Sequence, residues 1–156
     1  MKTIQILSIR KNTDPHVAAL EEGYLKRLKP FCDVRVTDIR ATYADGTPVP
    51  QVLAKEAELL RKKIPERSTL VVLHETGKAF SSPEFSAWFG RTLGAADGPL
   101  VFLIGSAYGL SDELLRGART VLSLSRMTFT HEMARLILLE QVYRAAQIAR
   151  GTDYHK

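Results

Sequence analysis

Short apolar runs alternate along this chain with segments whose apolar residues recur at helical spacing. Two of the runs, 69–73 and 100–104, are almost wholly apolar, which is typical of strands covered on both faces in a parallel sheet. The predicted strands are 3–9, 33–39, 69–73, 100–104 and 120–124, and the predicted helices start near residues 14, 51, 82, 111 and 131. Because strands and helices alternate, the pattern predicts one α/β domain over 1–156, with helices flanking a mostly parallel sheet.

Capping residues set the expected helix starts. Asp14 and Ser82 each precede a proline and are the expected N-caps of the first and third helices, and Thr130 is the expected N-cap of the last. Apolar stripes predict the buried faces, and Glu56 is among the charged residues of the second helix that are expected to face water. The stripes are Val17, Leu20, Tyr24 and Leu28 in the first helix and Leu53, Ala57, Leu60 and Ile64 in the second.

The last predicted helix, about 131–150, is apolar around most of its circumference. One face packed on a sheet buries only a stripe of a helix, so we expect this helix to pack on a second subunit as well, in a homodimer. A central helix covered by the chain's own loops remains the alternative. The chain then ends in a short tail, 151–156, which such a dimer would allow to reach over the partner's crevice.

Composition narrows the class of protein further. The 156 residues are 45% hydrophobic and 25% charged, which are values of a folded domain, and the net charge of +5 favours a polyanionic partner. Cys32 is the single cysteine, so it is expected to be a buried apolar residue and not part of a disulfide or a cysteine-rich metal site. No signal-peptide pattern and no apolar run of about 20 residues is present, so we expect a soluble, cytoplasmic protein that does not enter a membrane.

Two segments at the ends of predicted strands are candidates for ligand binding. The loop 105–109 follows a strand and precedes a helix, but its two glycines match neither the dinucleotide fingerprint nor the P-loop, so taken alone it predicts only a tight turn, with contact to a ligand as the alternative. The segment 123–130 is rich in hydroxyl groups and follows the last strand. It should therefore lie in the crevice where open α/β sheets bind ligands.

Metal chemistry is not expected. The run His131-Glu132 begins like a zinc-protease motif, but Arg135 stands where the second histidine would be, and arginine does not bind Zn²⁺. His74 and Glu75, at the end of the third strand, form a weaker pair near the mouth of the crevice.

Several of these motifs, taken in order, resemble the ribosomal RNA large subunit methyltransferase H family. They are Gly105-x-x-x-Gly109-Leu110-Ser111, the run from Leu122 to His131, Glu140-Gln141-x-Tyr143-Arg144-Ala145, and the terminal Tyr154-His155-Lys156. The resemblance implies a SPOUT fold with a deep C-terminal trefoil knot, a homodimer and S-adenosylmethionine as cofactor. It also implies N3-methylation of a pseudouridine in 23S rRNA on the assembled ribosome.

The resemblance also implies which residues form the site. The cofactor-binding residues would be Leu73, His74, Gly105, Ser106, Gly109, Ser125, Arg126, Met127, Thr128, Phe129 and Thr130. This chain has Ser106 where the family commonly has a second glycine, and Thr130 where it commonly has proline.

We further hypothesise that five residues surround the target base: His131, Arg135, Tyr154, His155 and Lys156. A histidine or tyrosine would assist removal of the N3 proton, and the cations would stabilise the anion and hold phosphates. The sulfonium of the cofactor is already an activated leaving group, so this chemistry requires no metal. The competing interpretation is a non-catalytic α/β module that binds nucleotide or RNA.

Overall fold

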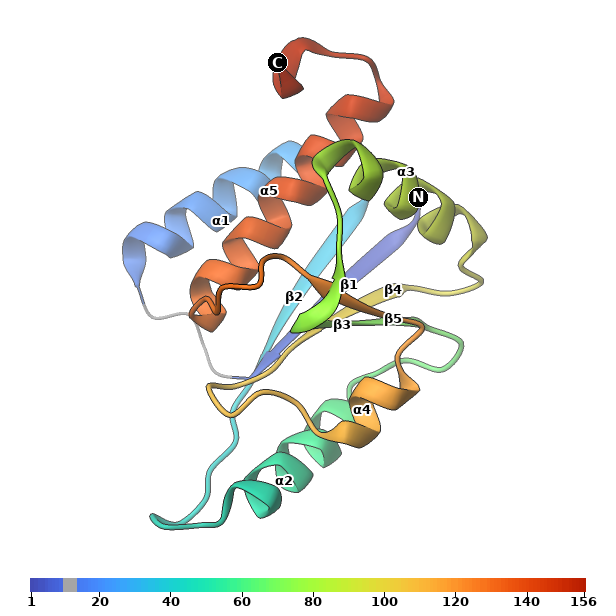
Figure 1. The fold of residues 1–156 in the computed structure, drawn as a ribbon. Helices are drawn as coiled ribbons and strands as arrows, with labels where there is room; N and C mark the ends of the chain where they lie inside the picture. Colours follow the sequence, from blue (N-terminus) through green and yellow to red (C-terminus); the bar gives the residue numbers. More distant parts are fainter. Residues whose placement is uncertain (10–13) are drawn as a thin grey trace.

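The computed structural model describes residues 1–9 and 14–156, and its centre is a five-stranded sheet (Figure 1). The strand order is β2-β1-β4-β3-β5, and all the neighbouring strands run parallel. The strands are β1 (Thr3–Ile9), β2 (Asp33–Ile39), β3 (Thr69–Ala79), β4 (Leu100–Ile104) and β5 (Thr120–Ser123). Every residue of β4 is buried, as its uninterrupted apolar sequence predicts for a central parallel strand.

Helices cover both faces of the sheet, which confirms the predicted α/β architecture (Figure 1). One core layer joins the sheet to α1 (Pro15–Leu28), α3 (Ser82–Ala95) and α5 (His131–Ala149). The other joins it to α2 (Val49–Arg61) and α4 (Asp112–Gly117). A short 3₁₀ helix, η1 (Asp153–His155), ends the chain. None of the described helices is long and apolar enough to cross a membrane.

The predicted caps form where local sequence specifies them. Asp14 accepts a hydrogen bond from the backbone N–H of His16 at 2.8 Å, and Thr130 accepts one from Met133 at 3.3 Å. The third helix is capped one residue earlier than predicted, by Ser81. Its hydroxyl accepts from the N–H of Glu84 while the Glu84 carboxylate accepts from the N–H of Ser81, a reciprocal capping box that Ser82 is not placed to form.

Strand β3 runs well past Leu73, where the apolar pattern predicted its end. Its pairing with β5 shifts register between Leu73 and Lys78, and both of these residues pair with Leu122. A Cβ atom on Gly77 would lie 2.6 Å from the carbonyl oxygen of Val121, so only glycine permits this approach of the two backbones. The apolar pattern did not predict this continuation of β3 because residues 74–76 are polar.

Two predicted helix faces are wrong at single positions. Leu20 is 53% exposed on α1, and the neighbouring Glu21 is buried in its place. Glu56 is 1% exposed on α2, although its charge predicted a solvent-facing position. Both acidic side chains have polar partners from distant parts of the chain, described below, which local periodicity does not reveal. Cys32 is buried as predicted, and this burial raises the pKa of its thiol to about 11.

Candidate functional site

A cavity of about 880 Å³ lies at the carboxyl end of the sheet. Its walls come from the end of β3, the loop after β4, the segment between β5 and α5, and the first turn of α5. This is the edge at which open α/β sheets bind ligands, and the volume suits a ligand the size of a nucleoside derivative.

The cavity brings together most of the residues predicted to bind a cofactor. Arg126 is the one predicted cofactor residue outside the described lining. Those that line the cavity are Leu73, His74, Gly105, Ser106, Gly109, Ser125, Met127, Thr128, Phe129 and Thr130. The prediction missed lining residues that are chain neighbours of these: Glu75, Ile104, Ala107, Tyr108, Leu110, Leu124, Glu132 and Ala134. Their positions close to the motif residues in the sequence could have identified them as lining residues.

The loop after β4 forms the tight turn that its glycines predict. The N–H of Gly109 donates to the carbonyl of Ser106 at 2.9 Å, and Gly109 has a φ of +87°, which glycine adopts without strain. A Cβ atom on Gly105 would lie 2.2 Å from the carbonyl oxygen of Gly109. The turn therefore closes on Gly105 so tightly that a side chain there would force the loop open.

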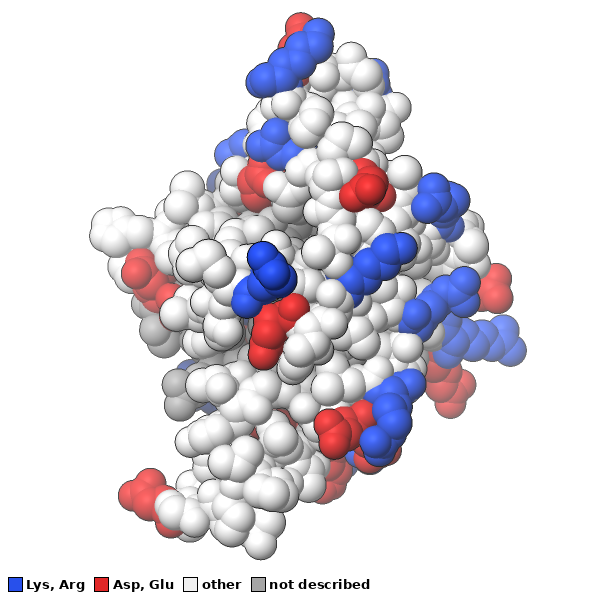
Figure 2. All heavy atoms as spheres, in the orientation of Figure 1, with Lys and Arg blue, Asp and Glu red and all other residues white. Residues whose placement is uncertain are grey.

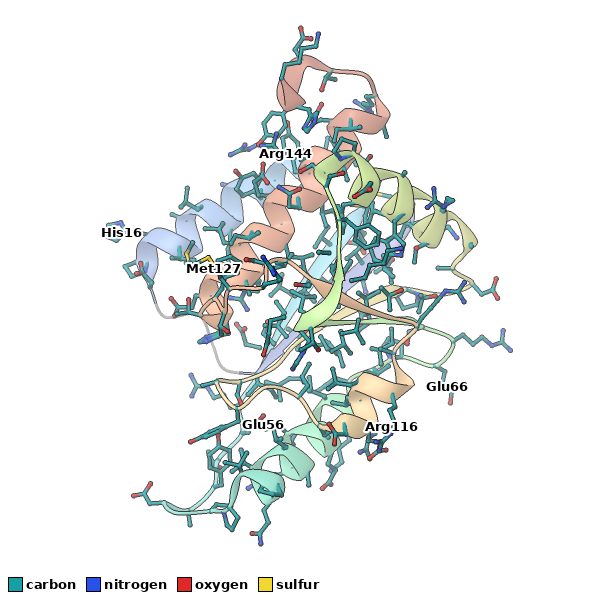
Figure 3. All side chains as sticks on the ribbon, in the orientation of Figure 1. His16, Glu56, Glu66, Arg116, Met127 and Arg144 are labelled. Atoms are coloured by element: carbon teal, nitrogen blue, oxygen red, sulfur yellow. The ribbon has the colours of Figure 1, made fainter. Side chains whose placement is uncertain are left out.

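Glu56 stabilises this turn through a hydrogen bond, a role that the sequence did not predict. Ser106 Oγ donates to the Glu56 carboxylate at 2.9 Å and also accepts from the N–H of Tyr108 at 3.3 Å. Tyr43 Oη donates to the other carboxylate oxygen at 3.3 Å. Figure 3 shows Glu56 between α2 and the loop. The Ser106 hydroxyl thus ties the cavity wall to a buried acidic side chain, a contact that a glycine at this position would lack.

If the cavity holds S-adenosylmethionine, as the resemblance implies, replacing Ser106 with alanine is expected to weaken its binding about fivefold. The substitution removes two hydrogen bonds that hold the turn, and a fivefold loss of affinity corresponds to about 1 kcal/mol, the typical net contribution of one such bond. Isothermal titration calorimetry measures the affinity. Ser82→Ala is the matched control, because Ser82 Oγ also bonds a side chain, Gln141 at 2.8 Å, but lies outside the cavity lining. Equal affinities for both variants would contradict a role for the Ser106 hydroxyl.

His131 is the one predicted catalytic residue in the cavity lining. It begins α5, directly after the capping residue Thr130. Its Nε2 atom is buried and has no hydrogen-bond partner among the described residues. Leaving a buried ring nitrogen unpaired carries a desolvation cost, which distinguishes His131 from the other residues of the cavity lining.

The serine hydroxyls before α5 are partly committed to the backbone. Ser123 Oγ donates to the carbonyl of Ser125 at 2.9 Å, and Ser125 Oγ accepts from the N–H of Met127 at 3.0 Å. These bonds shape the cavity wall. His74 is held in a similar way, because its Nδ1 atom lies 2.7 Å from the hydroxyl of Thr76.

The sequence predicts that Arg135 lies beside the target base. The structure places it in an ion cluster between helices and sheet, where it is only 3% exposed. Its Nε donates to Glu21 of α1 at 2.9 Å and its Nη1 donates to Asp38 of β2. Burial alone would lower the pKa of Arg135, but hydrogen bonds and charges from the two carboxylates together raise it. In this chain Arg135 joins α5 to α1 and β2 and does not belong to the described cavity lining.

The tail lies at the opposite end of α5 from His131, a helix of 19 residues and hence about 28 Å (Figure 1). Figure 3 shows Met127 beside the first turn of α5 and Arg144 near its other end. The ring of Tyr154 lies 4.9 Å from that of Tyr143, and its hydroxyl donates to Glu140 at 3.3 Å. His155 and Lys156 are exposed. One chain therefore does not bring its own tail to its own cavity.

The environment of Tyr154 fixes its protonation state. Burial, followed by the hydrogen bond with Tyr24, raises the pKa of Tyr154 to about 12. At neutral pH the phenol is therefore protonated and acts as a hydrogen-bond donor in this position. Among the described residues, no group of three or more histidine, cysteine, aspartate or glutamate side chains is placed to hold a metal ion.

Comparisons with known proteins agree on one family. Residues 1–155 match the sequence model described as "Predicted SPOUT methyltransferase". The chain is 38% identical over 152 residues to "Ribosomal RNA large subunit methyltransferase H" of Geobacter sulfurreducens, covering 97% of this chain and 98% of the relative. It is 43% identical over 134 residues to the protein of the same name from Thermotoga neapolitana, covering 86% and 87%. A putative member from Methanocorpusculum labreanum is 39% identical over 157 residues, covering 98% and 99%.

Proposed function

Because this chain belongs to the SPOUT methyltransferase family, we propose that it methylates N3 of a pseudouridine in 23S rRNA, on the assembled ribosome, with S-adenosylmethionine as the methyl donor. One observation carries the proposal. Segments far apart in the sequence, at the ends of β3, β4 and β5, converge on one cavity that is large enough for the cofactor and has His131 in its wall.

The residues present fit S-adenosylmethionine. The absence of a side chain at Gly105 lets the turn close against Gly109 and sets the shape of this wall, and Leu73, Leu110 and Leu124 supply apolar surface beside it. Ser106, Ser125 and Thr128 supply polar groups. When bound, S-adenosylmethionine supplies a methyl group from its sulfonium centre, and the rest of the cofactor is left as a neutral thioether. The cavity residues would hold the cofactor and exclude water.

His131 would accept the N3 proton of the base as the N–CH₃ bond forms and the S–CH₃ bond breaks. Its unpaired, buried Nε2 atom in the cavity wall supports this role. His131→Asn is expected to lower kcat by about 10²–10⁴-fold, the usual contribution of a general base, while calorimetry finds S-adenosylmethionine affinity changed by less than about threefold. His16→Asn on the exposed start of α1 is the control. A kcat equal to that of the wild type would remove His131 from the mechanism.

The tail would complete the site in a homodimer, from the partner subunit. Exposed apolar side chains support such a dimer: Leu20 lies on α1, Met133 on α5, and Met127 and Phe129 on the segment before α5. These two helices pack against each other, so the residues lie on one side of the molecule.

We also assign the deep trefoil knot of the family to this chain, with the close approach of Gly77 to β5 as a feature that suits a threaded backbone.

Deleting residues 153–156 tests both the tail and the reaction. Methyl transfer to ribosomes purified from a strain that lacks the protein should fall at least about a hundredfold, because the Tyr154 hydroxyl, the His155 imidazole and the Lys156 ammonium leave the base-binding side. S-adenosylmethionine affinity should stay within about threefold in calorimetry, since the tail is absent from the cavity lining. Unchanged turnover would eliminate the tail from catalysis. If the intact protein binds the cofactor but transfers no methyl group, the non-catalytic module is the better description.

A further inference from the structure

A second surface combines cations with aromatic rings on the side of the molecule formed by α3 and the β5 edge of the sheet. We define this basic–aromatic surface by Lys78, Phe80, Trp88, Arg91 and Arg119. The Phe80 and Trp88 rings stack with centroids 5.5 Å apart, and Lys78 Nζ lies 4.8 Å above Phe80. Trp88, Arg91 and Arg119 line a shallow hollow of about 640 Å³. These contacts make the five side chains one continuous feature.

The cations of this surface are available to a ligand. Lys78, Arg91 and Arg119 are exposed, and none of them forms an ion pair with a described carboxylate. The acidic neighbour of Lys78 is Glu84, whose carboxylate already accepts from the N–H of Ser81. Figure 2 shows basic side chains following one another down this side of the molecule, with acidic side chains beside some of them. Such a field attracts a polyanion.

The surface is also connected to the cavity. Strand β5 starts at Thr120, in the hollow, and ends at Ser123, directly before the residues that line the cavity. Four strand residues span about 13 Å, so a single flexible polymer strand can reach from one feature to the other. Trp88 is partly buried, with its ring packed against Phe80 and Phe85, and it lines the hollow, where it offers aromatic surface to a base or a ribose.

We propose that the basic–aromatic surface binds RNA next to the target nucleotide, with phosphates on Lys78, Arg91 and Arg119 and a base or ribose against Trp88. This inference rests on the proposed function and adds where the substrate docks. An acidic peptide would pair with the cations but would gain less from contact with the aromatic rings of Phe80 and Trp88. Single-stranded or looped RNA uses both, because its phosphates pair with cations while its unstacked bases pack on aromatic rings.

The test compares two charge-matched double variants. R91Q/R119Q removes the two arginines of the hollow, and K62Q/K63Q removes the same charge from the end of α2, on the other face of the sheet. Binding is measured by fluorescence anisotropy with a fluorescein-labelled 12-nucleotide RNA of mixed sequence across a salt series. Ribosome methylation and S-adenosylmethionine calorimetry are measured in parallel.

R91Q/R119Q is expected to bind the RNA about tenfold or more weakly at 0.1 M salt, and the log–log salt slope should become shallower by about 1.4, the value for two phosphate contacts on a single strand. K62Q/K63Q should bind close to wild type, as should R91K/R119K, which keeps the charge. S-adenosylmethionine affinity should be the same in all of these proteins.

RNA binding by R91Q/R119Q equal to that of K62Q/K63Q would overturn the assignment of this surface, and so would a wild-type protein that does not bind the RNA. Failure of the proposed function has a different signature, because RNA binding would respond to the substitutions while the wild type left ribosomes unmethylated.

Discussion

Replacing Arg135 with methionine is expected to lower the free energy of unfolding by about 3 kcal/mol. The substitution leaves the carboxylate of Glu21 buried without its cation, and that of Asp38 partly so, and breaking a buried ion pair from one side typically costs about 3–5 kcal/mol. The lower end applies because the Asp38 side chain is 29% exposed. Urea unfolding followed by circular dichroism measures the loss.

Arg61→Met is the matched control, because it removes an arginine from an ion pair, with Glu113 at 2.6 Å, that is exposed on both sides. Exposed pairs contribute about 0–1 kcal/mol, so this variant should stay near wild type. An Arg135→Met protein that is as stable as the control but inactive on ribosomes would contradict the structural role and restore Arg135 to the catalytic group.

Gly105→Ala is expected to weaken S-adenosylmethionine binding by about tenfold to a hundredfold, equivalent to about 1.4–2.7 kcal/mol. The new methyl group would lie 2.2 Å from the carbonyl oxygen of Gly109 and 2.8 Å from Leu110 Cγ, so the backbone of the turn must move. Calorimetry measures the affinity, and a thermal melt reports whether the fold survives.

Gly90→Ala supplies the control for a glycine without this constraint. A Cβ atom on Gly90 meets nothing within 4 Å, and the residue is exposed inside α3. The change should leave cofactor affinity unaltered and raise stability by about 0.5–1 kcal/mol, because alanine favours a helix interior over glycine. If Gly105→Ala binds the cofactor as tightly as Gly90→Ala, the turn is not a cofactor cradle.

The parts of the fold that were predictable are those specified by neighbours in the chain. Asp14 and Thr130 cap their helices as expected, because a cap needs only the next three residues. The apolar strand 100–104 is central in a parallel sheet, as its sequence predicts. The motif residues that follow β3, β4 and β5 converge on one cavity because the carboxyl ends of parallel strands share an edge.

What escaped prediction depends on partners far away in the sequence. Glu56 and Ser106 are 50 residues apart, and Glu21 and Arg135 are 114 apart. A charged residue placed by helical periodicity is expected to face water, and only the folded chain shows that each of these charges meets a partner inside. Helical periodicity therefore predicts a solvated Glu56, and the hypothesis that Arg135 lies beside the target base does not reveal its buried partners Glu21 and Asp38.

The tail shows a different limit. Its phenol, imidazole and ammonium suggested a site shared with His131, from which α5 separates them within one chain, and the sequence does not show where a partner subunit places its own tail. Under the proposed mechanism this separation requires a second subunit to supply the tail, and the exposed apolar side chains on α1 and α5 support such a dimer.

Mass spectrometry of 23S rRNA tests the central claim most directly. Nucleosides and mapped fragments are compared between a strain that lacks the protein, the same strain expressing it, and the strain expressing His131→Asn. We predict that one pseudouridine lacks a methyl group at N3 in the deletion strain, regains it with the wild-type protein, and does not regain it with the variant. Identical 23S rRNA from all three strains would contradict the assignment of this chain as a pseudouridine methyltransferase.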